Sequence, residues 1–336
     1  MKYCFGASIL FLENSMSPLS RRSFLRNSLG VAAAASAYAA VPEFLGGSLE
    51  AAAGGPRMIF PTTPRERISV ASWPFRFWID SPTNTYRDRS KPGMTLLEFP
   101  AMVVKEFKVN KLEPLGQHFA STDAGYLGQF REAVKKAGCH IVDIPMGGEE
   151  SYYDPDPKVR QKAIELGKKW VDIAVAVGSP SIRNHIGGAK NVKPDVARTA
   201  ESLGQVVKYA ASKNVVVNLE NDDLVSEDAF FLVDVIKKVN SPWLHALPDF
   251  CNSMMGGNAE FDYKAVSAMF GHAYNICHVK DSEVGDGGKV YRIDIPKTFD
   301  ILKASGFRGY CSMEWEGAGD SYQGTHKLIS DTLKYL

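Results

Sequence analysis

Four side chains of metal-ligand type recur in the second half of the sequence, each at the end of a short apolar run. They are Glu220, Asp249, His278 and Glu314, and subtracting their residue numbers gives gaps of 29, 29 and 36 residues. Three carboxylates and one imidazole form an oxygen-rich set suited to a divalent cation, with Mn2+, Mg2+, Co2+ and Zn2+ all left open. We therefore predict one divalent metal site if the fold brings the four residues together.

Each residue also has a simpler interpretation when it is taken alone. Glu220 or Asp249 could cap a helix or lie in a solvated loop, and His278 could be a hydrogen-bonded core histidine. The shared position at the end of an apolar run, repeated at similar spacing, favours the metal site over these alternatives.

The spacing itself predicts the elements that carry these residues. A (β/α)8 barrel of about 250 residues spends roughly 31 residues on each βα unit, and the C-terminal ends of all its strands meet on one face. Strand-like and helix-like segments alternate from Arg67 to the C-terminus, and the strands are continuous apolar runs of the kind found in buried parallel sheets. The sequence therefore predicts an α/β protein with a single-domain (β/α)8 TIM barrel over residues 67–336. A doubly wound sheet also fits the alternation, but no Gly-x-Gly-x-x-Gly follows the first strand.

The expected strands cover residues 67–74, 111–115, 140–145 and 181–185, followed by four that end at residues 220, 249, 278 and 314. The expected helices cover residues 95–107, 121–136, 156–177, 193–212, 226–239, 263–270, 295–304 and 322–336.

Composition bounds the classes of partner. The 336 residues are 45% hydrophobic and 23% charged, with a formal net charge of +1, which is typical of a globular protein with one large core. This near-neutral net charge does not favour nucleic acid as a partner. With 7 His, 5 Cys and neither Cys-x-x-Cys nor His-Glu-x-x-His, a zinc ribbon or zincin is not supported. The cysteines that follow Cys4 are expected to be small buried hydrophobes rather than disulfide partners.

The N-terminal segment has the form of a twin-arginine export signal. Ser20-Arg-Arg-Ser-Phe-Leu-Arg26 precedes an Ala-rich apolar stretch that ends at Ala40 and is too short for a stable membrane span. We interpret residues 1–53 as signal peptide and linker, with Met16 as an alternative start, and residues 54–66 as linker. The expected location is the periplasm or another exported site, with no membrane span after signal cleavage. A basic cytoplasmic helix is the alternative.

The strand-end motifs resemble a known family. Leu219-Glu220-Asn221, Pro248-Asp249, His278-Val-Lys280-Asp281 and Met313-Glu314-Trp315 are similar to the sugar isomerase/epimerase family with a xylose-isomerase-like TIM barrel, which includes ketose 3-epimerases and inosose dehydratase. The resemblance runs from Arg67 to the C-terminus. It implies that Glu220, Asp249, His278 and Glu314 bind one cation and that Glu220 and Glu314 form an acid/base pair. Members often carry Asp-x-x-His, whereas this chain has Asn252, which can hydrogen-bond a hydroxyl but cannot act as a base.

The chemistry expected of such a site is proton abstraction next to a carbonyl. The resulting enediolate needs a cation to stabilise its charge and two carboxylates to remove and return the proton. We therefore predict a metal-dependent isomerase or epimerase that acts on an unphosphorylated sugar or sugar derivative. A lyase or dehydratase on a keto-sugar or 3-keto-glycoside is the second hypothesis, and a non-catalytic carbohydrate-binding barrel is the third. A homo-oligomer is left open.

Further residues are candidates for contact with a small carbohydrate. Lys280 follows His278 by two positions and would point the same way along a strand, where it could contact an oxygen of the substrate or form a salt bridge. Trp73 could stack on a sugar ring or pack in the core. Arg292 follows the Gly-rich segment 285–288 and could reach over the site or be solvated. The predicted substrate contacts are His185, Asn252, Lys280, Arg292, His118 and Trp73, and Arg183 and Glu113 are further candidates.

Overall fold

Parallel strands and helices alternate along the residues that the computed structural model describes, 54–148 and 150–336. The predicted export signal lies outside the described residues. The parallel strands are β1 (Ile68–Ala71), β2 (Lys111–Glu113), β3 (His140–Ile141), β4 (Ser181–Arg183), β5 (Val216–Glu220), β6 (Leu244–Leu247), β7 (Ile276–Val279) and β10 (Tyr310–Met313). The helices are α2 (Phe99–Phe107), α3 (Ala124–Lys136), α4 (Pro157–Val177), α5 (Val196–Ser212), α6 (Ala229–Val239), α7 (Ala259–Phe270), α8 (Ile295–Ala304) and α9 (Ser321–Tyr335).

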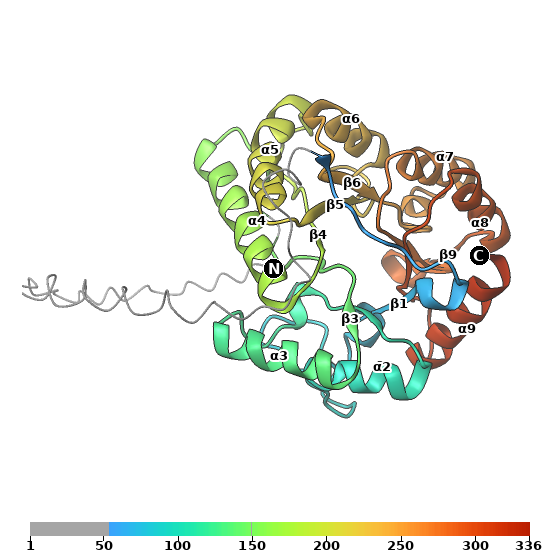
Figure 1. Ribbon diagram of the computed structural model, residues 1–336. Helices are drawn as coiled ribbons and strands as arrows, with labels where there is room; N and C mark the ends of the chain where they lie inside the picture. The colour runs from blue at the N-terminus through green and yellow to red at the C-terminus, as the bar shows by residue number, and fades with distance from the viewer. Residues whose placement is uncertain (1–53, 149) are drawn as a thin grey trace, which may run out of the picture. The chain divides into compact units, whose positions relative to one another are not determined.

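The parallel strands close into a barrel inside a ring of helices, which Figure 1 shows from one end. One sheet has the order β3-β2-β1-β10-β7, and a second has the order β4-β5-β6. Isolated bridges join the two sheets, because Pro145 pairs with Arg183 and Asp249 pairs with His278. The predicted (β/α)8 barrel is therefore confirmed.

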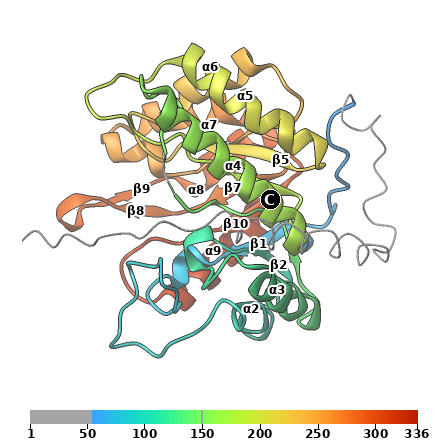
Figure 2. The same cartoon turned by 90° about the vertical axis from the view of Figure 1, so that its left-hand side faces the viewer.

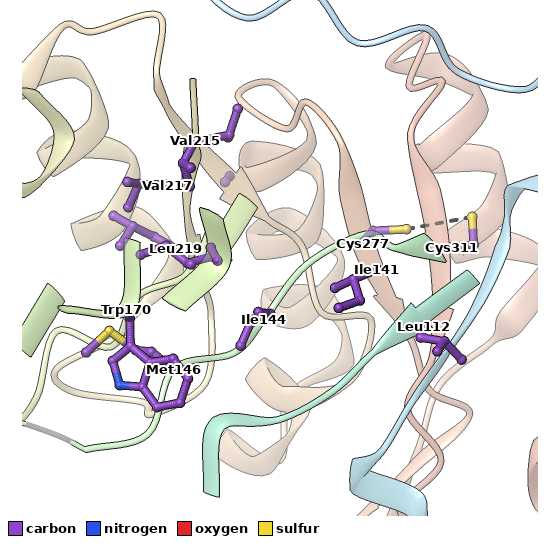
Figure 3. Close-up of a cluster of buried hydrophobic side chains, with 14 of the residues drawn as sticks. Leu112, Ile141, Ile144, Met146, Trp170, Val215, Val217, Leu219, Cys277 and Cys311 are labelled. Carbon is purple, nitrogen blue, oxygen red and sulfur yellow. Dashed lines mark hydrogen bonds between the residues drawn. The ribbon is translucent and has the colours of Figure 1, made fainter. Parts of the chain in front are cut away.

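The barrel core follows from the apolar strand sequences. In β5, Val216, Val217 and Leu219 are completely buried, and burying such a side chain contributes about 1.5–3 kcal/mol. Figure 3 shows Val217 and Leu219 among the apolar side chains of the core, together with Cys277 and Cys311. The Sγ atoms of these two cysteines lie 3.8 Å apart. All four cysteines in the described residues are free and buried, as predicted.

Side-chain caps set where most of the helices begin. Helices α3 to α9 each begin after an Asp or Asn whose side chain accepts a backbone N–H from the first turn. The helix predicted for 263–270 starts earlier, at Ala259, because Asn258 caps it. The helix predicted for 95–107 starts later, at Phe99, because Glu98 accepts hydrogen bonds from Thr95 and holds residues 95–98 in a turn.

One element was not predicted from the sequence, an antiparallel hairpin formed by β8 (Ser282–Val284) and β9 (Val290–Arg292). Gly287 and Gly288 in its turn have positive φ angles of 69° and 77°, which side chains disfavour. Figure 2 shows the hairpin extending from the end of the barrel between β7 and α8. Among the described residues, no helix combines the length and apolar character that a membrane crossing needs.

Candidate metal centre and its cavity

The four predicted ligands converge at one end of the barrel. Glu220 is the last residue of β5, Asp249 follows β6, His278 lies in β7 and Glu314 follows β10. One ligand atom from each lies within 4.8 Å of all the others, and the most exposed of the four, Glu314, is only 6% exposed. The strands bring them together because parallel strands end on the same face of a barrel.

The geometry of the cluster fits a divalent cation. His278 Nδ1 lies 2.7 Å from Glu220 Oε1 and 3.1 Å from Glu314 Oε2. Asp249 Oδ1 accepts hydrogen bonds from the backbone of Cys251 and Asn252, whereas its buried Oδ2 accepts none. Opposite oxygens around a cation at about 2.1 Å lie about 4.2 Å apart, close to the spread seen here. This oxygen-rich set, in which Asp249 Oδ2 accepts no hydrogen bond, is therefore suited to Mn2+, Mg2+, Co2+ or Zn2+.

The charges around Asp249 also favour a cation. Burial raises the pKa of Asp249 well above its ordinary value; Lys280 opposes this shift, and Glu220 and Glu314 add to it. Burial alone would also raise the pKa of Glu314, but His278 and Lys280 outweigh burial and hold it below its ordinary value. A bound cation would relieve the mutual repulsion of these carboxylates.

Lys280 lies inside this acidic cluster and contacts several of its members. Its Nζ donates to Asn252 Oδ1 at 2.9 Å and to Glu283 Oε2 at 3.1 Å, lies 3.2 Å from Glu314 Oε2, and also contacts Glu316. Burial would lower the pKa of Lys280, but Asp249 and the surrounding glutamates raise it well above its ordinary value. Lys280 is therefore a permanent cation, and it forms the salt bridge to Glu314 that was one of the two expected interactions.

Arg183 is the corresponding cation beside Glu220. Its Nη2 contacts Glu220 and lies 2.5 Å from Asp222 Oδ2, and its Nη1 contacts His185 Nε2. On the other side of the imidazole, His185 Nδ1 lies 3.3 Å from Glu227 Oε1. His185, Asp222 and Glu227 also lie close enough together to hold an ion, but the Arg183 guanidinium already supplies the positive charge there.

A cavity of about 280 Å³ opens beside the candidate ligands. Trp73 forms part of its wall, held by the Arg76 guanidinium 4.4 Å from its ring centre and by Tyr86 in an edge contact at 5.0 Å. The lining residues are Trp73, Tyr86, Leu115, Gly116, Gln117, Pro145, Met146, Gly147, Gly148, Arg183, His185, Glu220, Asp222, Asn252, Met255, Lys280, Glu283, Glu314 and Glu316. Trp73, His185, Asn252 and Lys280, four of the predicted substrate contacts, therefore face the same space.

Two predicted contacts lie elsewhere. His118 is completely buried, its Nδ1 is 2.7 Å from Ser72 Oγ, and burial lowers its pKa to about 3, so it is a neutral core histidine. Arg292 pairs with Ser282 across the hairpin and lines a separate surface hollow with Lys327. The prediction that these two residues line the site is corrected, because the His118 ring packs into the core against Ser72 and Arg292 lines the hollow beside Asp281 and Lys327 instead of the cavity.

Several cavity residues were not predicted. Asp222 and Glu316 stand two positions after Glu220 and Glu314, so the alternation of an extended chain could have indicated them. Glu283 reaches Lys280 from the unpredicted hairpin, and Tyr86 comes from the long connection between β1 and α2. The sequence carried no local signal for the last two residues.

Fold and site together define a (β/α)8 barrel with a buried group of metal-ligand side chains at the ends of four strands. Residues 104–336 match the family model described as xylose isomerase-like TIM barrel. The match covers more than half of the sequence, and the chain belongs to this family. No match was found among curated proteins.

Similar solved structures include sugar epimerases. The D-allulose 3-epimerase from Methylomonas sp. is 16% identical with a TM-score of 0.62, and the match covers 83% of this chain and 100% of that one. The 3-keto-D-glucoside 4-epimerase from E. coli is 15% identical with a TM-score of 0.58, covering 80% and 99%. An L-ribulose 3-epimerase is 16% identical with a TM-score of 0.60, covering 80% and 94%. At these identities the likeness shows a shared fold.

Proposed function

We propose that the protein is a metal-dependent isomerase or epimerase that acts on an unphosphorylated sugar or sugar derivative. The observation that carries this proposal is the convergence of Glu220 and Glu314 on one imidazole nitrogen, His278 Nδ1. These two carboxylates come from different strands, so they reach the space between them from different directions. Such a pair can take a proton from one face of a substrate and return it on the other.

The residues of the chain have separate roles in this reaction. A bound divalent cation would polarise the substrate carbonyl and stabilise the negative charge that develops when the adjacent proton leaves. Glu314, whose pKa is held below its ordinary value, is ionised at neutral pH and can accept that proton. Arg183 and Lys280 hold Glu220 and Glu314 in place. Lys280 and Asn252 can also bind substrate hydroxyl groups.

The charge of the cavity supports an uncharged substrate. Its lining includes Glu220, Asp222, Glu283, Glu314 and Glu316, whereas its permanent cations are Arg183 and Lys280. Both cations already pair with these carboxylates, so neither is free to receive an anionic group of the substrate. A phosphate or carboxylate on the substrate would be repelled.

Proton NMR in D2O tests the proposed reaction. The metal-loaded protein would be incubated with free ketoses and with 3-keto-glycosides, and Glu314→Gln protein would serve as the control. We expect deuterium to enter at one carbon without elimination, and only with the unaltered protein. A complete lack of exchange across the panel, in protein shown to hold its metal, would contradict the proposal and favour a non-catalytic carbohydrate-binding barrel.

Elimination is the second candidate reaction. Asn252, at the place where the family often has histidine, donates to Glu220 Oε1 at 3.3 Å and cannot act as a base. If the enediolate carries a leaving group on the next carbon, it can expel that group and form a carbon–carbon double bond. This is the reaction of a lyase or dehydratase. An unsaturated product from a 3-keto-glycoside in the same NMR experiment would replace the epimerase assignment with this one.

We also propose that the protein is exported through the twin-arginine route, on the basis of Arg21 and Arg22 and the apolar stretch that follows. Replacing both arginines with lysine should retain the protein in the cytoplasm, as measured by fractionation of cells that produce it. An unchanged distribution would contradict this location.

A further inference from the structure

A second buried carboxylate lies behind the candidate metal centre, on the far side of the His278 ring. Glu113 ends β2 and is completely buried, and its Oε1 lies 2.8 Å from His278 Nε2. Its other oxygen, Oε2, accepts a hydrogen bond from Ser312 Oγ at 2.5 Å. Because β1 and β10 separate β2 from β7 in the sheet, Glu113 reaches across two strands to meet this imidazole.

The two ring nitrogens of His278 therefore have different partners. Among the described residues, Nε2 pairs only with Glu113, whereas Nδ1 faces Glu220 and Glu314, which belong to the candidate ligand set. A neutral imidazole has one N–H donor and one acceptor nitrogen, and an ionised carboxylate can only accept. A proton on Nε2 satisfies Glu113 and leaves the lone pair of Nδ1 pointing at the ligand cluster.

We propose that Glu113 is a positioning residue that fixes the Nε2–H tautomer and the ring orientation of His278, so that Nδ1 is presented to the divalent cation. This inference rests on the proposed function, because it needs a cation at the cluster. Carboxylates that hold the second nitrogen of a metal-binding histidine commonly change metal affinity 10–100-fold when they are removed. Ser312 in turn fixes the Glu113 carboxylate from the neighbouring strand β10.

The barrel interior contains a matched control for this role. Asp143 is also completely buried, and its Oδ1 accepts hydrogen bonds from Ser181 and Asn218, but it makes no hydrogen bond or salt bridge to His278 in the structure. Replacing either acid with its amide removes one buried carboxyl group from the same interior. Only the change at Glu113 alters the partner of the histidine ring, since a glutamine amide can donate to Nε2 and favour the opposite tautomer.

Mn2+ titration of chelator-treated protein tests the proposal, with free Mn2+ measured by electron paramagnetic resonance. We expect Glu113→Gln to weaken Mn2+ binding about 10–100-fold and Asp143→Asn to change it by less than about threefold. Equal affinities for Glu113→Gln and the unaltered protein would overturn the positioning role, as would equal weakening by both changes. Failure of the unaltered protein to bind Mn2+ would instead overturn the proposed metal-dependent function, on which this inference rests.

A measurement on the unaltered protein keeps the proposal testable if Glu113→Gln does not fold. Nitrogen-15 NMR of histidine-labelled, Zn2+-loaded protein reports which ring nitrogen carries the proton, and a His278→Asn sample assigns the signal. We expect a proton on Nε2 that exchanges slowly with solvent, and metal bound at Nδ1. A proton on Nδ1, or metal bound through Nε2, would overturn the proposal.

Discussion

The two sides of the cavity differ in the types of residue that they present. The ligand side, formed at the ends of β5, β6, β7 and β10, carries all four candidate ligands. The wall side follows β1 to β4 and presents Trp73, Gly116, Met146 and Gly147, together with the cation Arg183. Both sides are built from the same repeating strand–helix unit. The fold alone therefore does not determine which strands bear the candidate catalytic and metal-binding residues. The difference separates the residues expected to govern turnover from those expected to govern substrate binding.

The largest expected effect comes from the ligand side. Glu314→Gln removes a candidate base and a candidate ligand, and a positioned base typically contributes 10²–10⁴-fold to rate. We therefore expect turnover to fall by roughly that factor, measured as kcat with a substrate identified by deuterium exchange. Glu260→Gln is a suitable control, because Glu260 is an exposed residue of α7 that forms a surface salt bridge with Lys264. A Glu314→Gln protein that keeps more than about a tenth of its activity would show that the ligand side does not carry the chemistry.

The second effect concerns the cation within the ligand side. Lys280→Met leaves Asp249, Glu283, Glu314 and Glu316 without their shared positive charge. Removing one partner of a buried ion pair costs about 3–5 kcal/mol, so the metal-free variant should unfold at much lower denaturant. Because Mn2+ supplies positive charge to the same cluster, it should stabilise the variant more than the unaltered protein. Equal stabilisation by Mn2+ in urea titrations of both proteins would contradict this account.

On the wall side, we expect a change in binding rather than in turnover. Trp73→Leu keeps an apolar side chain but removes the ring that contacts Arg76 and Tyr86. A sugar ring packed on this indole would gain about the 0.5–1.5 kcal/mol typical of aromatic contacts, so KM should rise by roughly 2–10-fold with kcat nearly unchanged. A fall in kcat as large as that of Glu314→Gln would remove the distinction between the two sides.

The last prediction tests a buried acid that belongs to neither side. Burial raises the pKa of Asp262 in α7 from its ordinary value of 3.8 to about 7, and no described residue donates a hydrogen bond to its carboxylate. The folded state therefore binds this proton more tightly than the unfolded state, and the associated stability is present below pH 3.8 and is lost as pH rises to about 7. Asp262→Asn should be more stable than the unaltered protein by roughly 1–3 kcal/mol at pH 8 and indistinguishable at pH 4, measured by urea unfolding. A gain of equal size at both values would contradict the pKa assignment.

The sequence predicted the barrel and the ligand side because both depend on regular spacing. Glu220, Asp249, His278 and Glu314 each stand at the end of an apolar strand, and one βα unit separates each from the next. Parallel strands convert such spacing into proximity, so no knowledge of side-chain packing was needed.

The remaining residues could not be predicted because long-range packing places them. Glu283 reaches Lys280 from a hairpin formed by residues 282–292, and Arg292 of the same hairpin lines a separate surface hollow instead of the cavity. His118 turns into the core to meet Ser72. In the sequence, Glu113 is an ordinary acidic residue of a short strand. Only the closed barrel brings its side chain against His278.

Diffraction from crystals grown with Mn2+ tests the central claim most directly, through an anomalous difference map recorded at the manganese absorption edge. We predict one strong peak coordinated by Glu220, Asp249, His278 Nδ1 and Glu314, and its loss in Glu220→Gln crystals grown in the same way. The account would be contradicted if these four side chains showed no peak at full Mn2+ loading, or if the metal were bound only at His185, Asp222 and Glu227.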